Sequence, residues 1–275
     1  MKFFIFSDPH YSDMETAVFT RRPSASLGKL KALASVLAGC DGIICLGDLI
    51  DKCDADRKTA AASAAAVVNS DADLTGANNA NAGNSENAAY SADSAAAAYL
   101  REITDFLISF GKPVYSLMGN HDCAVFSRED FAKISGLDVT PRAVKNGKST
   151  MIFLDACYLA GDFPQPVGKS DWTDSNLPAE QINLLSETLD SLPAGESVFV
   201  FTHQCLDPAA ESRHIIKNAP DVRELLETAV ARGLKVHAIA GHYHKGSENT
   251  VAGVRYTTLP ALCELDSARY LLLEI

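Results

Sequence analysis

Five short polar segments of the chain are built from Asp, Asn and His, most of them beside Gly. In chain order they are Asp8-Pro9-His10, Gly47-Asp48-Leu49-Ile50-Asp51, Gly119-Asn120-His121-Asp122, Thr202-His203-Gln204 and Gly241-His242-Tyr243-His244. Carboxylates, imidazoles and amide oxygens bind ions such as Mn, Fe or Zn, and imidazole also transfers protons near neutral pH. Since Gly, Asn and Asp are also the usual turn formers, a plain polar turn is the alternative for each segment taken alone.

Each segment follows an apolar stretch that we expect to be a β-strand. The expected strands are 2–7, 42–46, 113–117, 149–154, 197–202, 235–240, 254–259 and 269–274, and the expected helices are 26–37, 96–110, 128–134, 178–192 and 221–231. The alternation of strands and helices in the first half indicates parallel strands with helical crossovers, whereas the closely spaced strands after 249 indicate a hairpin-like region. Because the carboxyl ends of parallel strands share one rim, where ligands bind, the five segments should converge there.

The spacing within the segments is also informative. In an extended or gently turned backbone, residues two apart point to one side, so Asp8 with His10, or His242 with His244, could reach one ion. The candidate ligands, none of them a thiolate, are Asp8, His10, Asp48, Asn120, His203, His242 and His244. Seven side chains are too many for one tetrahedral ion and suit two ions that share a carboxylate.

The five segments, in this order, resemble the motifs of the calcineurin-like metallophosphoesterase superfamily: D-x-H, G-D-x-x-D, G-N-H-D/E, a single H and G-H-x-H. The resemblance runs from Asp8 to His244 and implies an α/β fold, a four-layer α/β/β/α sandwich. It implies one ion on Asp8, His10 and His244, a second on Asn120, His203 and His242, and Asp48 as the bridge. It also implies His121 as proton donor to the leaving oxygen, with Asp51 and Asp122 orienting the ligands or the acid.

The activity implied is hydrolysis of phosphodiester or pyrophosphate bonds in small nucleotide-type substrates by metal-bound hydroxide, with two ions of which Mn or Fe is favoured over Zn. The segment from Thr20 to Leu30, the stretch after Leu177 and the stretch after Lys217 are similar to the ADP-ribose/CDP-alcohol diphosphatase-like branch. A phosphomonoesterase, including a protein phosphatase, is the alternative enzyme. The remaining alternative is a metallophosphoesterase fold kept as a non-catalytic binding scaffold.

Other residues of these chemical types have weaker assignments. Arg22 is a candidate for binding a substrate phosphate, since a guanidinium matches its geometry, although a surface salt bridge is a competing interpretation. His214 is a candidate substrate contact or a solvated loop histidine. His237 lies within an expected strand and is interpreted as structural. Cys123 and Cys205 adjoin motif residues and are interpreted as small packing groups.

Composition limits the class of protein. The 275 residues carry a net charge of −11 without a dense basic stripe, which argues against long nucleic acids as partners and leaves small phosphate esters or nucleotides. The apolar run at the N-terminus is shorter than a signal peptide requires, and no run is long enough to span a bilayer. Seven scattered cysteines indicate reduced thiols, so we expect a cytoplasmic protein without membrane contact.

We expect residues 1–275 to form one domain with an insertion at about 53–97. This stretch holds 17 Ala, 6 Asn and 5 Ser among 45 residues. It has too few large apolar side chains to offset the entropy lost on ordering. A tolerated surface insertion and a flap over the site are the two interpretations.

Overall fold

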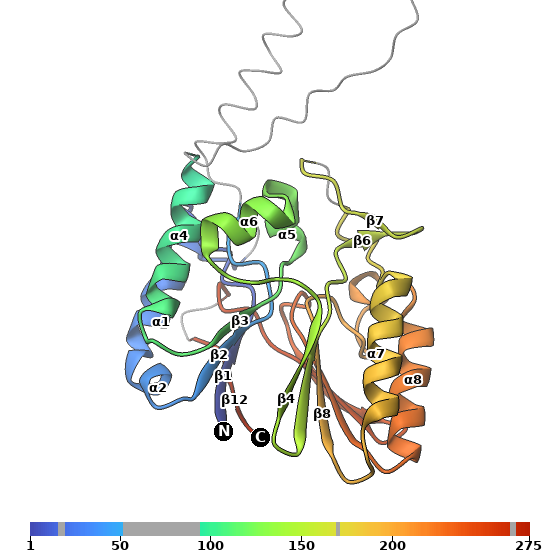
Figure 1. Cartoon of the computed structure of the whole chain (residues 1–275). Helices are drawn as coiled ribbons and strands as arrows, with labels where there is room; N and C mark the ends of the chain where they lie inside the picture. The colour runs from blue at the N-terminus through green and yellow to red at the C-terminus, as the bar shows by residue number, and fades with distance from the viewer. Residues whose placement is uncertain (16–19, 52–93, 169–170, 265–267) are drawn as a thin grey trace, which may run out of the picture.

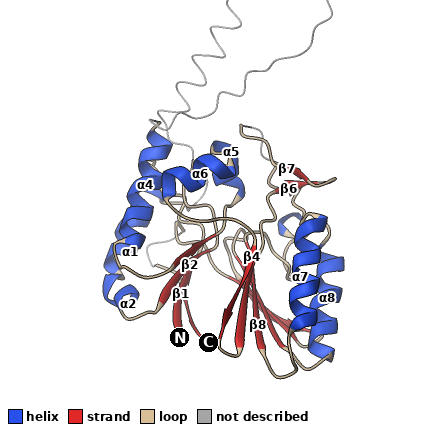
Figure 2. Ribbon diagram, in the orientation of Figure 1, coloured by secondary structure: helices blue, strands red, loops and turns tan. Residues whose placement is uncertain are grey.

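The computed structural model describes residues 1–15, 20–51, 94–168, 171–264 and 268–275. Two large sheets lie face to face between two groups of helices, as Figure 1 shows, and Figure 2 shows helices flanking the strands on both sides. This arrangement is the predicted four-layer α/β/β/α sandwich. The prediction of one domain over 1–275 stays a prediction, and most of the expected insertion lies outside the described residues.

The first sheet has the strand order β12-β1-β2-β3. Its strands are β1 (Lys2–Phe6), β2 (Gly42–Cys45), β3 (Val114–Ser116) and β12 (Leu271–Glu274). The helical elements beside it are η1 (Pro23–Ala25), α1 (Ser26–Ala32), α2 (Ala34–Ala38), α4 (Ala95–Ile108), α5 (Asn120–Val125) and α6 (Arg128–Ser135). The strands β1, β2 and β3 are parallel, as the alternation of strands and helices predicts.

The second sheet has the order β10-β11-β9-β8-β5-β4. Its strands are β4 (Arg142–Asn146), β5 (Ser149–Phe153), β8 (Ser197–Thr202), β9 (Lys235–Ala240), β10 (Ser247–Val251) and β11 (Val254–Thr258). The helices α7 (Ala179–Ser191) and α8 (Ala219–Ala231) cover its outer face, and the short elements β6 (Tyr158–Leu159), β7 (Phe163–Pro164) and η2 (Ser212–His214) lie in its connections. The central strands β5, β8, β9 and β11 are parallel neighbours, which places their carboxyl ends together.

Three apolar clusters fill the three interfaces between the four layers. One joins the first helical layer to the first sheet through residues such as Phe4 and Leu100. A second lies between the sheets and includes Ile5 and Phe201. The third joins the second sheet to α7 and α8. A strand such as β1 is apolar on both faces because each face packs in a different cluster.

Several elements differ from expectation. The helix expected at 26–37 is interrupted at Leu33, where the backbone leaves the helical region. The strand β4 was not expected, because it is an edge strand without a buried residue and has only two apolar side chains, Ala143 and Val144. The expected hairpin is β10 and β11, but β12 crosses to the first sheet and pairs antiparallel with β1. Residues 94–97, assigned to the insertion, include the N-cap Ser94 and the start of α4.

The described cysteines agree with the expectation of reduced thiols. All six are buried and free, and Cys53 lies outside the described residues. Cys123 and Cys205 are both buried in the packed interior, as interpreted from the sequence. Within the described part of the chain, no helix combines the length and apolar composition needed to cross a membrane.

Candidate metal centre

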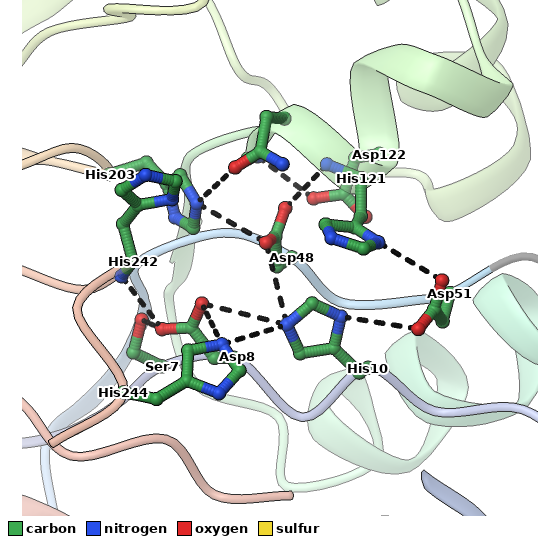
Figure 3. Close-up of polar contacts among 12 residues, drawn as sticks. Ser7, Asp8, His10, Asp48, Asp51, His121, Asp122, His203, His242 and His244 are labelled. Atoms are coloured by element: carbon green, nitrogen blue, oxygen red, sulfur yellow. Dashed lines mark hydrogen bonds and ion pairs between the residues drawn. The ribbon is translucent and has the colours of Figure 1, made fainter. Parts of the chain in front are cut away.

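The five polar segments converge at the rim where the carboxyl ends of β1, β2, β3, β8 and β9 meet, and Figure 3 shows their side chains facing one another. Both sheets contribute, since the first three strands belong to one sheet and the last two to the other. The third segment is not a loop: Asn120 begins the short helix α5, directly after Gly119. A Cβ on Gly119 would collide with the Asp48 carboxylate, so the glycine permits the close approach of the two segments.

Asp8, His10 and His244, here called the Asp8 group, form one half of the site. The Nε2 atoms of His10 and His244 lie 3.2 Å apart. Asp8 Oδ1 is 3.7 Å from His10 Nε2 and 3.5 Å from His244 Nε2. Three ligand-type atoms therefore surround one small volume.

Asn120, His203 and His242, here called the Asn120 group, form the other half. His203 Nε2 lies 3.2 Å from Asn120 Oδ1, and His242 has a ring nitrogen within 4.8 Å of ligand atoms of both His203 and Asp48. Asp48 Oδ2 lies between the two groups, 3.3 Å from His203 Nε2 and 3.5 Å from His10 Nε2. One carboxylate oxygen thus faces both halves of the site.

The second oxygen of each carboxylate is fixed by the protein. Asp8 Oδ2 accepts the backbone N–H of His242 at 3.0 Å and the hydroxyl of Ser7. Asp48 Oδ1 accepts the backbone N–H of His121 at 2.7 Å. Hydrogen bonds to one oxygen of each carboxylate therefore hold its other oxygen in place, facing the imidazoles.

Two imidazoles are oriented through Nδ1. His203 Nδ1 lies 2.8 Å from the carbonyl oxygen of Leu46, and His244 Nδ1 lies 2.9 Å from Glu264 Oε1. If Nδ1 donates in these bonds, Nε2 carries the lone pair that faces the site. Such outer partners set the tautomer and orientation of a metal-binding imidazole.

Three polar atoms at this rim are buried without a hydrogen-bond partner among the described residues: Asp8 Oδ1, His10 Nδ1 and His242 Nε2. Buried polar atoms normally have partners, and an ion is one way to satisfy them. The donor set of carboxylate, imidazole and amide oxygen fits a transition-metal ion. The residues at this rim therefore fit the predicted pair of ions.

The charges within the site favour cations. Burial acts to raise the pKa of Asp8 and of Asp48, but the surrounding imidazoles outweigh it and hold each pKa below its ordinary value. Burial lowers the pKa of His10 to about 4 and lowers that of His242 as well. Burial acts to lower the pKa of His203 and of His244 too, but Asp48 raises that of His203 to about 10 and Asp8 raises that of His244. The site thus combines ionised carboxylates with two imidazoles, those of His10 and His242, that are neutral near pH 7.

Four of the seven candidate ligands have a left-handed backbone: φ is 54° at Asp8, 46° at His10, 52° at Asp48 and 64° at His242. This region is uncommon for residues other than glycine, and such outliers cluster at functional sites. The sequence predicted an extended or gently turned backbone in Asp8-x-His10 and His242-x-His244, and the left-handed residues in both pairs rule out the extended form. The two histidines of the second pair also face different groups, so the argument that both reach one ion fails for them. The assignment of the seven ligands to two ions stays a prediction.

His121 lies beside the Asp8 group with its ring edge-on to that of His10, at a centroid distance of 4.4 Å. Its Nδ1 is 3.0 Å from Asp51 Oδ1. Burial acts to lower the pKa of His121, but the charges of Asp48 and Asp51 outweigh it and raise the pKa. A protonated imidazole held at Nδ1 has Nε2–H available as an acid.

Asp122 acts on the backbone. Its carboxylate accepts N–H groups of Gly119, Leu49 and Ile50 at 2.9–3.2 Å, which ties the start of α5 to the segment after β2. Burial and the charge of Asp48 raise the pKa of Asp122 to about 7. Its contacts fit the orienting role rather than contact with a reactant.

The two candidate substrate contacts differ in position. His214 lies against Trp172 and His242, with ring centroids 5.2 and 5.0 Å away, and it lines a cavity of about 240 Å³ above the candidate ligands. Arg22 does not line this cavity, and its guanidinium donates to the carbonyl of Arg21. Binding of a phosphate by Arg22 stays a prediction. His237 is apart from the site and bonds Thr257 on the neighbouring strand, as its structural interpretation requires.

Sequence reasoning missed five residues that the structure brings to the site: Arg21, Trp172, Arg213, Cys263 and Glu264. Arg21, Trp172 and Arg213 line the 240 Å³ cavity, and Arg21 Nη2 lies 3.5 Å from His244 Nε2. Trp172 is the only tryptophan in the chain and lies on a loop, which is a weak signal for a binding surface. Arg21 lies in the segment from Thr20 to Leu30 that resembles the diphosphatase-like branch, and the other three lie in no motif.

Comparisons with known proteins identify structures with a similar fold. No match was found among curated protein sequences. A crystal structure described as a dimetal phosphatase from Danio rerio has a TM-score of 0.70 at 17% identity, covering 98% of this chain and 91% of that one. GAP50 of Plasmodium, described as an anchor in the inner membrane complex, has a TM-score of 0.53 at 12% identity and covers 94% and 70%. TT1561 of Thermus thermophilus has a TM-score of 0.50 at 10% identity and covers 94% and 89%.

These structures share the fold at low identity. The family model of the calcineurin-like phosphoesterases matches residues 1–246, a range that contains all five polar segments. The match therefore spans both sheets and both halves of the candidate metal site. The chain belongs to the calcineurin-like phosphoesterase family.

Proposed function

We propose that the protein is a metal-dependent phosphohydrolase that cleaves phosphodiester or pyrophosphate bonds of small nucleotide-type substrates. The observation that carries the proposal is the position of Asp48 Oδ2 between two ligand groups, at 3.3 Å from His203 Nε2 and 3.5 Å from His10 Nε2. The Asp8 group and the Asn120 group would each hold one ion, Mn, Fe or Zn, with Asp48 shared. Two such ions supply Lewis-acid stabilisation and lower the pKa of a water molecule.

His121 would donate a proton to the leaving oxygen. Its position supports this role, since its side chain is 30% exposed and lines the cavity that also contains Asp48 and Asn120. Asp51 would act as a positioning residue, because its Oδ1 is 3.0 Å from His121 Nδ1 while its Oδ2 is 3.8 Å from His10 Nδ1. One carboxylate thereby fixes the acid relative to a candidate ligand.

The cavity walls support a substrate with more than one phosphate or with a base. Arg21 and Arg213 supply guanidinium groups suited to phosphate oxygens. Trp172 offers a 37% exposed indole, with Arg213 at 5.6 Å from its ring centroid, which suits stacking of a nucleobase. A larger cavity of about 540 Å³ shares Arg21, Arg213 and His214 with this one and could hold the rest of a dinucleotide-type molecule.

A non-catalytic scaffold is the competing function. The Plasmodium neighbour described as an anchor has a similar fold, so the fold alone does not decide between an enzyme and a scaffold. The candidate ligands and the proton donor favour the enzyme. A scaffold has no need of buried carboxylate and imidazole atoms that lack a hydrogen-bond partner among the described residues.

A substrate panel tests the proposal. Purified protein with added Mn is assayed on nucleoside-diphosphate-linked substrates, cyclic nucleotides and phosphomonoesters, together with bis-p-nitrophenyl and p-nitrophenyl phosphate. Turnover of pyrophosphate or diester substrates well above that of monoesters is the expected result. Preference for monoesters would replace the proposal by a phosphomonoesterase, and absence of hydrolysis with no bound metal would leave the scaffold.

A further inference from the structure

A thiol lies beside the Asp8 group. One ring nitrogen each of His10 and His244 and the Sγ atom of Cys263 lie within 4.8 Å of one another. Cys263 is fully buried. It lies outside the five segments that carry the family resemblance.

The backbone holds Cys263 at this place from two sides. Its N–H donates to the carbonyl of Asp8 at 3.1 Å, and its own carbonyl accepts the N–H of Arg22 at 2.8 Å. The adjacent Glu264 bonds His244 Nδ1. The position of the thiol is therefore set by the same segments that position the candidate ligands.

The spacing fits a shared ion. With metal–sulfur and metal–nitrogen bonds of about 2.3 and 2.1 Å, two ligand atoms on one zinc-like ion lie at most about 4.4 Å apart. The three ligand atoms lie within 4.8 Å of one another, a spacing that a small side-chain adjustment brings into this range. The thiol is thus within coordinating reach of an ion bound by His10 and His244.

A second observation points to a ligand at the same place. Asp8 Oδ1 is fully buried, has no hydrogen-bond partner among the described residues, and lies 3.5–3.7 Å from the same two imidazoles. A buried carboxylate oxygen without a donor calls for a cation. The thiol and this oxygen lie beside the same pair of rings.

We propose that Cys263 coordinates, as a thiolate, the ion held by Asp8, His10 and His244; this rests on the proposed function, which requires that ion. On coordination the S–H bond breaks, its electron pair binds the metal and the proton leaves to solvent, with no change in oxidation state. A thiolate is a soft ligand, so the Asp8 group would select Zn or Fe(II) over Mn, whereas the Asn120 group has only nitrogen and oxygen donors.

Absorption of the cobalt-loaded protein tests this directly. The full-length chain is loaded with Co(II), its metal content is measured, and the near-ultraviolet region is examined for a thiolate-to-cobalt charge-transfer band. We expect the band in the wild type and in Cys40→Ser, since Cys40 precedes β2 at the opposite end of the sheet. We expect its loss in both Cys263→Ser and Cys263→Ala. A Zn-against-Mn competition should shift toward Mn by about tenfold or more in these variants.

The cobalt spectrum separates the thiolate proposal from the proposed function. Bound cobalt without the band in the wild type, or a band that survives in Cys263→Ser, overturns the thiolate ligand and leaves the proposed function standing. A wild type that binds no cobalt, zinc or manganese overturns both proposals. If a Cys263 variant fails to fold, absence of the band from the cobalt-loaded wild type still overturns the thiolate ligand, and the other Cys263 variant identifies the thiol when the band is present.

Discussion

The Asp8 group and the Asn120 group share Asp48 and differ in how the protein holds them. In the Asn120 group, His203 is fully buried and its Nδ1 is fixed by the backbone carbonyl of Leu46. In the Asp8 group, His244 is 16% exposed and its Nδ1 is fixed by the side chain of Glu264, itself 17% exposed. The larger cavity is lined by His244 and Glu264, and from the Asn120 group by His242 but not by His203.

The two groups should also differ in how readily a bound ion exchanges. A ligand held by backbone in a closed interior keeps its geometry, whereas one held by a partly exposed carboxylate depends on a flexible side chain. We therefore expect the ion on the Asp8 group to exchange more readily than the ion on the Asn120 group. Substitutions in and around the two groups test this asymmetry, from the largest expected effect to the smallest.

Loss of the shared carboxylate should disable both halves at once. In Asp48→Asn, kcat/KM for bis-p-nitrophenyl phosphate should fall by at least about 10³-fold, because several kcal/mol of charge stabilisation depend on two neighbouring ions. Metal content per chain should fall as well. The control is Asp105→Asn, an exposed carboxylate on α4, which should retain wild-type activity. Near-normal turnover by Asp48→Asn would contradict the shared-ligand geometry.

Removal of the acid should affect chemistry and spare metal binding. In His121→Ala, kcat for a nucleotide substrate with a poor leaving group should fall by about 10²–10⁴-fold, the usual contribution of a general acid. The loss should be smaller with bis-p-nitrophenyl phosphate, because p-nitrophenolate leaves without a proton. Asp51→Asn should show the same pattern with a smaller loss. An equal loss on both substrates, or loss of bound metal, would assign His121 a different role.

The asymmetry itself is tested through Glu264. Glu264→Gln should weaken the affinity of one of the two ions by about 10–100-fold, as changes in outer-shell partners do. Metal titration followed by calorimetry should change from two tight phases to one tight and one weak phase. Glu211→Gln is the matched control, since Glu211 lines the larger cavity and contacts none of the seven candidate ligands in the described contacts. Equal weakening of both ions would remove the distinction between the groups.

Trp172, which lines the cavity above the two groups, should affect substrate binding more than turnover. Trp172→Ala should raise KM for a nucleotide substrate by about tenfold with little change in kcat, because base stacking on an aromatic ring contributes about 1–3 kcal/mol. Phe163→Ala, which removes a 67% exposed ring on β7, should leave KM unchanged. A fall in kcat alone would mean that Trp172 positions His214 or His242 rather than the substrate.

The position of a candidate ligand was predictable from sequence where a polar residue directly follows a strand. The ends of β1, β2, β3, β8 and β9 share a rim by topology, so the polar residues after them had to meet. Backbone detail was not predictable in this way. Asp8 and His10 have positive φ, which the spacing argument did not anticipate, although the side chains still converge.

The site residues that sequence analysis missed show a second limit of prediction from sequence. Arg21 and Arg22 are neighbours of the same type, and only Arg21 lines the cavity, because the direction of a side chain depends on local backbone that no pattern encodes. Cys263 and Glu264 reach the site through the segment between β11 and β12, and β12 crosses to the other sheet. The pairing of β12 with β1 is a long-range contact that closely spaced strands do not imply.

The smallest predicted effect contrasts a histidine outside the site with those in it. His237 is buried in β9, and its Nε2 bonds Thr257 Oγ1 at 2.8 Å. Burial, with Arg255 nearby, lowers the pKa of His237 to about 4. The folded pKa is below the ordinary value of about 6.5, so the unfolded chain binds more protons and stability falls as the pH drops below about 6.5. From about pH 7.5 to pH 6 this residue should account for about 1 kcal/mol of lost unfolding free energy.

Urea unfolding of the wild type and of His237→Gln at both pH values measures this contribution. Glutamine can still hydrogen-bond Thr257 and does not titrate, so the variant should lose less stability on acidification. The site histidines titrate in both proteins, and their effect cancels in the comparison. An identical pH dependence would mean that His237 has its ordinary pKa in the folded chain. The expected difference would confirm that His237 stays neutral through its contacts within the sheet, in contrast to the candidate ligand His242, whose Nε2 has no partner among the described residues.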